Sequence, residues 1–357
     1  MSAVSGIHGA KKPNPVIAEK DTNLEFVQPK NWIPSKNTLI TYKGKNGDVH
    51  APPFVIGAWP WGDKSTWHWK PEEFDEVKRA WQLCLANGAN FIDTAQVYGS
   101  GESEEICGKL FQGLPRDSFI IQTKYYVVPQ MVDILHPTTA PVKALEDTLK
   151  RMNLDYVDIY LVHGPIHMQS IATIAKGMAE CVDKGMAKCI GVANYSIDEM
   201  LKIEEELAKY GVPLATNQCE YSVLRRLPEL SGLLRICAER GIVFQSYSSL
   251  GQGRLTGKYT AEHKPPKSYR FSSYDMKDIE PIVAVLKTIA AKRQTSISAV
   301  ALNYNLSRGI SPLVGIRKMQ QAQENLAALG WRLTDEEIGE IDRVSLKGYS
   351  TELWQRD

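Results

Sequence analysis

Short apolar runs alternate with longer segments of helical periodicity along most of this chain. Apolar runs of about four to eight residues, bounded by turn residues, are typical of strands that are buried on both faces. We therefore predict strands over residues 54–57, 90–94, 118–124, 156–163, 188–193, 214–220, 242–247 and 311–315.

Between these runs, apolar residues recur at the spacing of an amphipathic helix. In one such segment Leu145, Leu149 and Met152 fall on the same face. Ser196, followed three residues later by Glu199, has the pattern of a capping box at a helix start. We predict helices over residues 71–85, 140–152, 170–183, 196–209, 227–239 and 296–307.

The alternation of eight strands with helices predicts a parallel α/β sheet, and eight is the number that closes a (β/α)8 TIM barrel. A doubly wound open sheet is the alternative that the same pattern allows. Residues 39–49 alternate weakly around Lys45-Asn46-Gly47, which indicates a hairpin. We expect a single barrel domain over residues 37–345, with an N-terminal extension over 1–36 and a C-terminal tail over 346–357.

The composition is that of an ordinary globular protein, with 43% hydrophobic and 23% charged residues among 357. The net charge of +1 argues against a nucleic-acid partner, and no apolar run reaches the length of a membrane span. The six cysteines form neither a Cys-x-x-Cys pair nor a zinc-ligand spacing, so they are interpreted as core residues in a reducing compartment. We expect a cytoplasmic protein that binds no metal, nucleic acid or membrane.

Polar side chains follow three consecutive predicted strands. Asp93 ends the second strand and Tyr98 lies in the loop after it, while Lys124 ends the third strand and His163 the fourth. Singly, such residues are more often turn formers, solvated charges or structural histidines. The carboxyl ends of barrel strands, however, meet at one mouth, so we expect these four side chains to lie together.

This set of side chains suits the delivery of a proton to an oxygen atom. A neighbouring ammonium favours a phenolate, so Lys124 is expected to lower the pKa of Tyr98 from its reference value of ~10. Asp93 would keep Lys124 protonated and in place. His163 would orient a carbonyl oxygen through a hydrogen bond.

The sequence Asn-Phe-Ile-Asp-Thr-Ala-x-x-Tyr-Gly over residues 90–99, followed by Gly-Glu-Ser-Glu over 101–104, resembles the signature of the aldo-keto reductase superfamily. The similarity extends over residues 39–329 or thereabouts. It implies an NADP(H)-dependent enzyme that reduces an aldehyde or ketone by direct hydride transfer, with Tyr98 as general acid. The catalytic residues that the resemblance implies are Asp93, Tyr98, Lys124 and His163.

The resemblance also implies where the nicotinamide cofactor is bound. Asn194 and Gln218 would hydrogen-bond the nicotinamide amide, and the ring of Tyr247 would stack on the nicotinamide. The residues implied for the pyrophosphate are Ser248, Leu250 and Gly251. Those implied for the phosphate and adenosine end are Gly315, Arg317, Gln321, Glu324 and Asn325.

Two basic residues at the start of a helix bear on the choice of cofactor. A helix start with Arg317 and Lys318 is a ready-made anion site, although plain surface charge would give the same pair. We therefore expect NADP(H) rather than NAD(H). The chain departs from the family pattern at Ala193, where a hydroxyl residue is frequent, and at Ser249, where many relatives carry proline.

Four tryptophans crowd the loop over residues 59–69. We expect Trp59, Trp61 and Tyr125 to contact the substrate, although such side chains also pack barrel rims. Aromatic walls suit an aromatic or apolar carbonyl compound. The Trp-x-Trp-Gly-Asp sequence over residues 59–63 resembles the pyridoxal-reductase-like branch of the superfamily, which implies a pyridine or aromatic aldehyde.

Two other functions remain open at this point. The potassium-channel β-subunits resemble the same superfamily and act chiefly as cofactor-sensing binding partners, and an intact set of catalytic residues does not rule out that role. The same site would also serve a biosynthetic imine reductase or a dehydrogenase. The oligomeric state is not encoded in any of these patterns.

Overall fold

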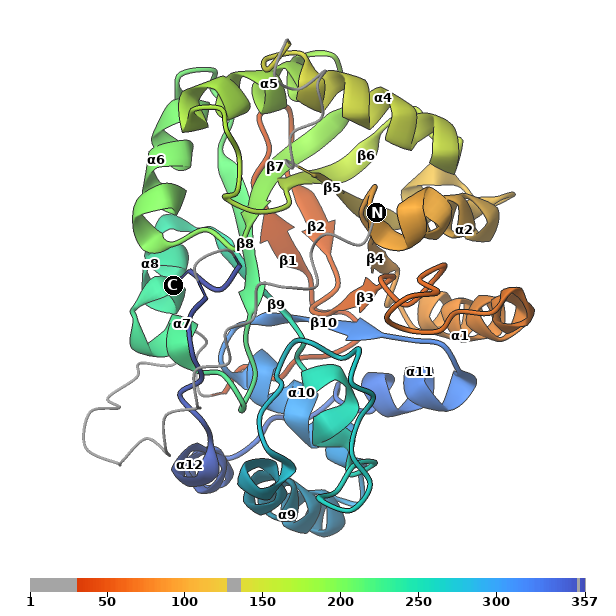
Figure 1. Ribbon diagram of the computed structural model, residues 1–357, viewed down its shortest axis with the longest axis vertical. Coiled ribbons are helices and arrows are strands. Elements are labelled where there is room, and N and C mark those ends of the chain that lie inside the picture. Colours follow the sequence, from red (N-terminus) through yellow and green to blue (C-terminus); the bar gives the residue numbers. More distant parts are fainter. Residues whose placement is uncertain (1–30, 127–135, 352–353, 357) are drawn as a thin grey trace.

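Eight parallel strands close into a barrel in the computed structural model, which describes residues 31–126, 136–351 and 354–356 (Figure 1). Each strand pairs with its sequence neighbours, and the last closes the ring against the first. The strands are β3 (Val55–Gly57), β4 (Phe91–Asp93), β5 (Ile120–Tyr125), β6 (Val157–Val162), β7 (Ala187–Ala193), β8 (Leu214–Glu220), β9 (Val243–Tyr247) and β10 (Ser311–Gly315). The TIM barrel is therefore confirmed, and the open sheet is excluded.

Helices form the outer layer of this barrel (Figure 1). The α-helices are α1 (Phe74–Ala86), α2 (Glu102–Phe111), α4 (Ala140–Met152), α5 (Ile171–Asp183), α6 (Ile197–Ala208), α7 (Leu227–Leu230), α8 (Leu233–Arg240), α9 (Met276–Arg293), α10 (Ile297–Ser307), α11 (Met319–Leu326) and α12 (Asp335–Val344). The 3₁₀ helices are η1 (Pro71–Glu73), η2 (Tyr98–Gly101), η3 (Arg116–Ser118) and η4 (Gly251–Thr256). The helix predicted over 227–239 is divided into α7 and α8 because Gly232 between them has a left-handed φ of 87°.

A hairpin closes the amino-terminal end of the barrel. Strand β1 (Ile40–Tyr42) pairs antiparallel with β2 (Val49–Ala51), as the alternation over 39–49 predicts (Figure 1). Tyr42 is fully buried and its ring meets Phe91 edge to face, with centroids 5.8 Å apart. The hairpin thus supplies apolar side chains to the packed interior at this end of the barrel.

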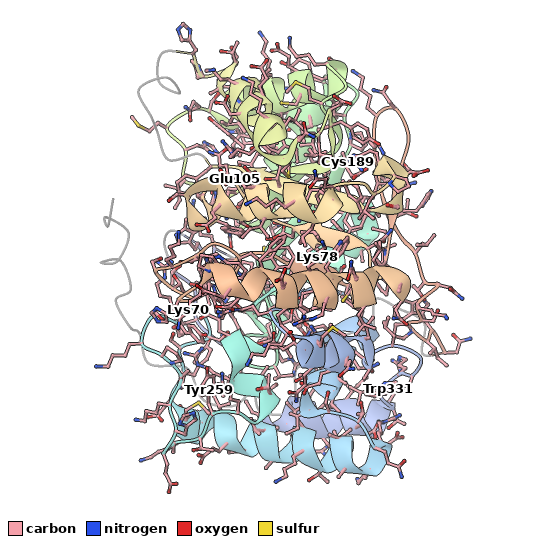
Figure 2. All side chains as sticks on the ribbon, turned by 90° about the vertical axis from the view of Figure 1, so that its right-hand side faces the viewer. Lys70, Lys78, Glu105, Cys189, Tyr259 and Trp331 are labelled. Atoms are coloured by element: carbon pink, nitrogen blue, oxygen red, sulfur yellow. The ribbon has the colours of Figure 1, made fainter. Side chains whose placement is uncertain are left out.

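The outer helices bury one face against the barrel and expose the other. On α1, Val77 and Trp81 are buried in the main core, whereas Lys78 points outward; Glu105 does the same on α2 (Figure 2). Within the described ranges, no helix combines the length and the apolar character needed to cross a bilayer.

The expected terminal segments are only partly described. Residues 1–30 lie outside the described residues, and within 31–36 the carbonyl oxygen of Pro34 accepts a hydrogen bond of 2.7 Å from the backbone N–H of Gly330. At the other end, the N–H of Leu346 donates to the carbonyl oxygen of Val223 at 2.9 Å. Both ends of the described chain therefore have contacts with the barrel.

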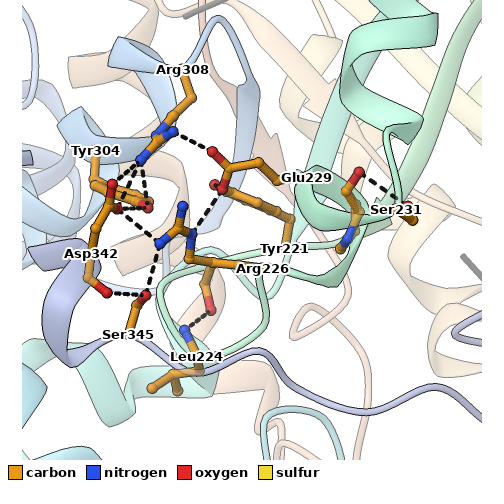
Figure 3. A network of polar contacts seen from close by, with 11 residues as sticks. Tyr221, Leu224, Arg226, Glu229, Ser231, Tyr304, Arg308, Asp342 and Ser345 are labelled. Carbon is orange, nitrogen blue, oxygen red and sulfur yellow. Dashed lines mark hydrogen bonds and ion pairs between the residues drawn. The ribbon is translucent and has the colours of Figure 1, made fainter. Parts of the chain in front are cut away.

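A buried network of charges attaches α12 to the barrel (Figure 3). Glu229 accepts hydrogen bonds from Arg308 and, at 2.8 Å, from Nε of Arg226. Asp342 on α12 accepts from Arg308 at 2.6 Å and forms an ion pair with Arg226 at 3.1 Å. Two guanidinium groups and two carboxylates balance each other, so each charge has partners of opposite sign inside the protein.

The first prediction concerns this network. Glu229→Gln removes one of its two negative charges and should lower the free energy of unfolding by about 3–5 kcal/mol, because Arg226 and Arg308 stay buried without full compensation. Urea denaturation measures the change. The control is Glu239→Gln, which breaks the exposed pair with Arg235 and should cost less than about 1 kcal/mol. Equal losses in the two variants would contradict the role of the network.

Candidate active site

A cavity of about 1360 Å³ opens at the carboxyl ends of the barrel strands. Its wall includes the last residues of four strands: Gly57, Asp93, Tyr247 and Gly315. This is the end of a TIM barrel at which the βα loops meet. The opposite end is filled by the hairpin, so the cavity is the open mouth of the barrel.

The carboxylate of Asp93 lies at the floor of this cavity and is 2% exposed. Its Oδ1 accepts hydrogen bonds from Nε2 of Gln122 at 2.5 Å and from Nε2 of Gln218 at 3.1 Å. Gln245 links these two amides, because its Oε1 accepts from both at 2.9 Å. A layer of three amides across the barrel therefore fixes the position and orientation of Asp93.

Lys124 is fully buried at the end of β5, and three hydrogen bonds satisfy its ammonium group. Nζ donates to Oδ2 of Asp93 at 2.6 Å, to the carbonyl oxygen of Thr94 at 2.8 Å and to Oη of Tyr98 at 3.2 Å. Burial lowers the pKa of Lys124, and the charge of Asp93 opposes that effect. The ammonium is thus held between a carboxylate and a phenol oxygen.

The phenol of Tyr98 differs from the sequence-based expectation in its acidity. Its pKa is raised well above 10.0, mainly by burial and further by Asp93, whereas we expected Lys124 to lower it. The expected lowering is not found because burial of the phenolate is the largest cause and the negative charge of Asp93 acts in the same direction. Tyr98 is therefore a neutral phenol over the physiological range.

The imidazole of His163 lies beside this phenol, with ring centroids 5.6 Å apart and planes at 80°. Burial lowers the pKa of His163 well below 6.5, and the positive charge of Lys124 adds to that effect. Its Nδ1 is buried and has no hydrogen-bond partner among the residues described. The structure therefore brings Asp93, Tyr98, Lys124 and His163 together and holds the histidine neutral.

Three residues expected at the nicotinamide also line the cavity. Asn194, at a left-handed φ of 64°, donates from Nδ2 to the carbonyl oxygen of His163 at 3.2 Å. Its Oδ1 accepts a hydrogen bond of 2.9 Å from Oη of Tyr247. Gln218 is the third of these cavity residues, and its Nε2 donates hydrogen bonds to Asp93 and to Gln245.

The loop after β9 contains the residues expected at the pyrophosphate. Ser248 and Leu250 line the cavity, and Ser248 has a left-handed φ of 56°. Gly251 lies next to the lining at a left-handed φ of 55°, which favours glycine, and a Cβ there would come within 2.7 Å of Leu224 Cδ1. Ser249, the departure from the family pattern, is buried and donates from Oγ to the carbonyl oxygen of Ser246 at 2.8 Å.

The residues expected at the adenosine end lie between the end of β10 and the second half of α11. All five line the cavity: Gly315, Arg317, Gln321, Glu324 and Asn325. The N–H of Arg317 donates to Oε1 of Gln321 at 2.7 Å, and Nδ2 of Asn325 donates to the carbonyl oxygen of Gly315 at 3.4 Å. The guanidinium of Arg317 forms an ion pair with Glu73, a residue that the sequence analysis did not single out.

Of the three residues expected at the substrate, only Trp59 lines the cavity. Its ring stacks on Tyr98 at 6.1 Å and meets Phe271 edge to face at 5.8 Å. Trp61 lies outside the lining; it is fully buried, and its Nε1 donates to the carbonyl oxygen of Ile316 at 2.7 Å. Its placement at the substrate is therefore wrong, and it packs the barrel rim.

Tyr125 is also misplaced by the sequence analysis. Successive side chains of a strand point to opposite faces, so Tyr125 points away from the interior that Lys124 enters, and it packs against the helices. The next residue, Tyr126, lines the cavity, with its ring 5.6 Å from His163. Trp354 from the C-terminal segment lines it as well, at 5.8 Å from His163.

One buried carboxylate joins two segments that border the cavity. Glu220, at the end of β8, is 1% exposed. Its Oε1 accepts from N and Oγ of Ser272 at 2.9 and 2.8 Å, and its Oε2 accepts from Nε2 of Gln355. Phe271 and Trp354, the neighbours of these two partners, line the cavity. The loop after β9 and the C-terminal segment are thus attached to the same side chain.

Comparison with known proteins agrees with this geometry. A profile of the Aldo/keto reductase family matches residues 53–346. The chloroplastic pyridoxal reductase of Arabidopsis thaliana is 32% identical over 83% of this chain and 83% of its own length. The NADH-specific methylglyoxal reductase of Escherichia coli strain K12 is 30% identical over 81% of this chain and 93% of its own. The structure of a glycerol dehydrogenase from Gluconobacter oxydans is similar with a TM-score of 0.71 and 26% identity, covering 85% of this chain and 94% of that one.

The second prediction concerns the protonation of His163. In NMR spectra of protein with ¹⁵N-labelled histidine, the ring nitrogens of His163 should stay in the neutral form well below pH 6.5. Lys124→Met should raise this pKa, because it removes the nearby positive charge, yet leave it below 6.5 because burial is the larger cause. The matched control is Lys188→Met, at a remote pair with Asp158, and should leave the pKa unchanged. Titration of His163 at or above pH 6.5 in the parent protein would contradict this interpretation.

Proposed function

This chain belongs to the aldo/keto reductase family, and from that premise we propose that it reduces an aldehyde or ketone to an alcohol with NADP(H), with Tyr98 as the general acid. Membership in the family makes it an oxidoreductase that acts on carbonyl groups. The observation that carries the finer proposal is the hydrogen bond from Nζ of Lys124 to Oη of Tyr98 at the cavity wall.

That hydrogen bond determines what the phenol can do. Lys124 donates to the oxygen of Tyr98, so the phenol's own hydrogen is left for another acceptor. A carbonyl oxygen in the cavity would be such an acceptor, and it gains negative charge as its carbon is reduced. When the proton moves, the phenolate that forms lies 3.2 Å from an ammonium that stabilises it. Asp93 holds Lys124 in place for this step.

His163 is suited to positioning the same oxygen. A neutral imidazole carries one N–H donor and one acceptor, and it adds no charge that would compete with Lys124. Its ring is edge-on to Tyr98, so a carbonyl oxygen can lie close to both. We assign His163 to the orientation of the carbonyl and Tyr98 to its protonation.

The cavity residues fit a nicotinamide dinucleotide. Besides Nδ1 of His163, Nε2 of Gln252 is a buried polar atom without a hydrogen-bond partner in the described part of the chain, and both residues line the cavity. A bound nicotinamide supplies the hydride that adds to the carbonyl carbon. Asn194 and Gln218 would hold its amide, and Tyr247 would pack on its ring.

The other end of the cavity suits the phosphates and the adenosine. Ser248 and Leu250, with Gly251 beside them, would lie along the pyrophosphate. Arg317 and Lys318, at the start of α11, would attract a 2′-phosphate, which supports the proposal of NADP(H). The remaining residues proposed at the adenosine end are Gly315, Gln321, Glu324 and Asn325.

We propose an aromatic or pyridine aldehyde as substrate. The rings of Trp59, Tyr126, Phe271 and Trp354 surround the space beside Tyr98 and His163 and would stack on a flat molecule. The relative from Arabidopsis thaliana acts on pyridoxal by its name, which supports a pyridine aldehyde. The relative from Escherichia coli acts on methylglyoxal with NADH, so cofactor and substrate both vary among relatives at this level of identity.

The third prediction tests the general acid. Tyr98→Phe should lower kcat for reduction of pyridine-4-carbaldehyde by about 10²–10⁴-fold, the usual contribution of a positioned acid, and leave the affinity for NADPH unchanged. The control is Tyr195→Phe. This change removes a buried phenol that contacts His167 and lies outside the cavity. NADPH oxidation by Tyr98→Phe at the parental rate would rule out Tyr98 as the acid.

The fourth prediction concerns the pH dependence of kcat/KM for reduction. The pKa of His163 is lowered and that of Tyr98 is raised, so neither changes its protonation between pH 6.5 and 10.0. The pKa of Lys124 is lowered, so activity should decline with rising pH below 10.5 as the ammonium loses its proton. Asp93→Asn should move this decline to lower pH, because Asp93 raises the pKa of Lys124.

Normalised pH profiles of the parent and Asp93→Asn proteins measure this shift. Asp158→Asn is the control, because Asp158 is a buried carboxylate that pairs with Arg116 and Lys188 away from the cavity. It should leave the alkaline decline in place. An alkaline decline at the same pH in the Asp93→Asn variant would show that Lys124 is not the group responsible.

A further inference from the structure

The guanidinium of Arg317, at the end of the cavity proposed for the 2′-phosphate, already contacts a carboxylate of this chain. Its Nε donates to Oε2 of Glu73 at 2.7 Å, and its Nη2 donates to Oε1 of Glu73 at 2.5 Å. The pair is partly buried, with 21% of the Arg317 side chain and 26% of the Glu73 side chain exposed. Two parallel charge-assisted bonds make this one of the stronger contacts of a guanidinium.

A second carboxylate from the same segment meets the start of α11. The backbone N–H of Met319, in the first turn of α11, donates to Oε1 of Glu76 at 2.9 Å. The pKa of Glu76 is lowered chiefly by this hydrogen bond. The positive charge of Lys318 also lowers the pKa. Two groups here would attract an anion, the guanidinium of Arg317 and the start of α11. Each of them already contacts a carboxylate, from η1 and from α1 respectively.

These contacts change the electrostatics of the proposed phosphate site. Arg317 and Lys318 carry two positive charges, and Glu73 and Glu76 carry two negative charges, so these four groups together have no net charge. A 2′-phosphate, with a charge of about −1.5 to −2, must either displace Glu73 from Arg317 or lie beside its carboxylate. Both arrangements cost free energy that a neutral 2′-hydroxyl does not pay.

A ribose 2′-hydroxyl is instead a partner for a carboxylate. Acidic residues accept hydrogen bonds from this hydroxyl in proteins that bind NAD, whereas arginine accommodates the 2′-phosphate of NADP. Arg317 and Glu73 place both kinds of group at one point of the cavity wall. The site therefore holds a group suited to each of the two cofactors.

We propose that Glu73 sets the choice between NADPH and NADH, by weakening the binding of the 2′-phosphate at Arg317 and accepting the 2′-hydroxyl. This inference rests on the proposed function only in requiring that the cavity binds a nicotinamide dinucleotide. Its consequence is a preference for NADP(H) that is smaller than Arg317 and Lys318 alone would give.

The position of Glu73 is fixed by the fold. Its backbone N–H donates to the carbonyl oxygen of Lys70 at 3.0 Å, and its Oε1 accepts from the N–H of Lys70 at 3.2 Å. Helix α1, which begins at the next residue, packs directly against α11. Glutamine at position 73 can keep the bond to Lys70 while removing the charge, so Glu73→Gln isolates the electrostatic effect.

The fifth prediction is tested by calorimetric titration of the full-length protein with NADP⁺ and with NAD⁺. Glu73→Gln should tighten NADP⁺ binding roughly tenfold, because a partly exposed carboxylate no longer competes with the phosphate. It should leave NAD⁺ binding unchanged or weaken it. The ratio of the two dissociation constants is thus the readout, and it needs no turnover.

Glu72→Gln is the matched control, because it removes the same charge one residue away, and Glu72 is exposed and makes no ion pair with Arg317. A tenfold change with Glu73→Gln and less than about twofold with Glu72→Gln would support the inference. Equal effects, or weaker NADP⁺ binding in Glu73→Gln, would overturn it, since Glu73 would then orient Arg317 for the phosphate. Binding of neither dinucleotide by the parent protein would overturn the proposed function together with the inference.

Discussion

The buried ion pair between Lys124 and Asp93 is the constraint on which the rest of the mouth of the barrel depends. An ammonium that is fully buried must have a partner of opposite charge and an acceptor for each of its hydrogens, and Asp93, Thr94 and Tyr98 provide them. Asp93 in turn needs donors, which come from amides on β5 and β8. The pair therefore exists only when these strands are in register, so the chemistry of Tyr98 and His163 depends on closure of the barrel.

The hairpin at the other end contributes to the same arrangement. The amide of Gln245 donates to Oη of Tyr42 at 3.0 Å, which connects the plug of the barrel to the layer that holds Asp93. Below that layer the described side chains of the interior form a buried apolar cluster. A low-dielectric surrounding raises the pKa of Tyr98 and lowers that of His163, and both groups are neutral for that reason.

Much of this fold is readable from the sequence, because strand and helix periods are local properties. The predicted strands over 214–220 and 311–315 and the helix over 140–152 have the bounds that the structure shows. Thr334 and Glu337 form a capping box at the start of α12, a signal that was available in the sequence and would have predicted that helix. Trp61 was misplaced because composition does not say which face of a loop a ring occupies, whereas the alternation of side chains after Lys124 would have placed Tyr125 on the outer face. Glu73 and Trp354 could not be placed, since their contacts join segments far apart in the chain.

Glu220 connects two borders of the cavity through one side chain. The loop after β9 borders the proposed nucleotide channel, the C-terminal segment borders the proposed substrate space, and both are fastened to one carboxylate. A movement that frees either segment breaks hydrogen bonds to the same side chain. Because both borders of the cavity share this one attachment, a conformational step at Glu220 would affect the spaces proposed for the nucleotide and for the substrate together.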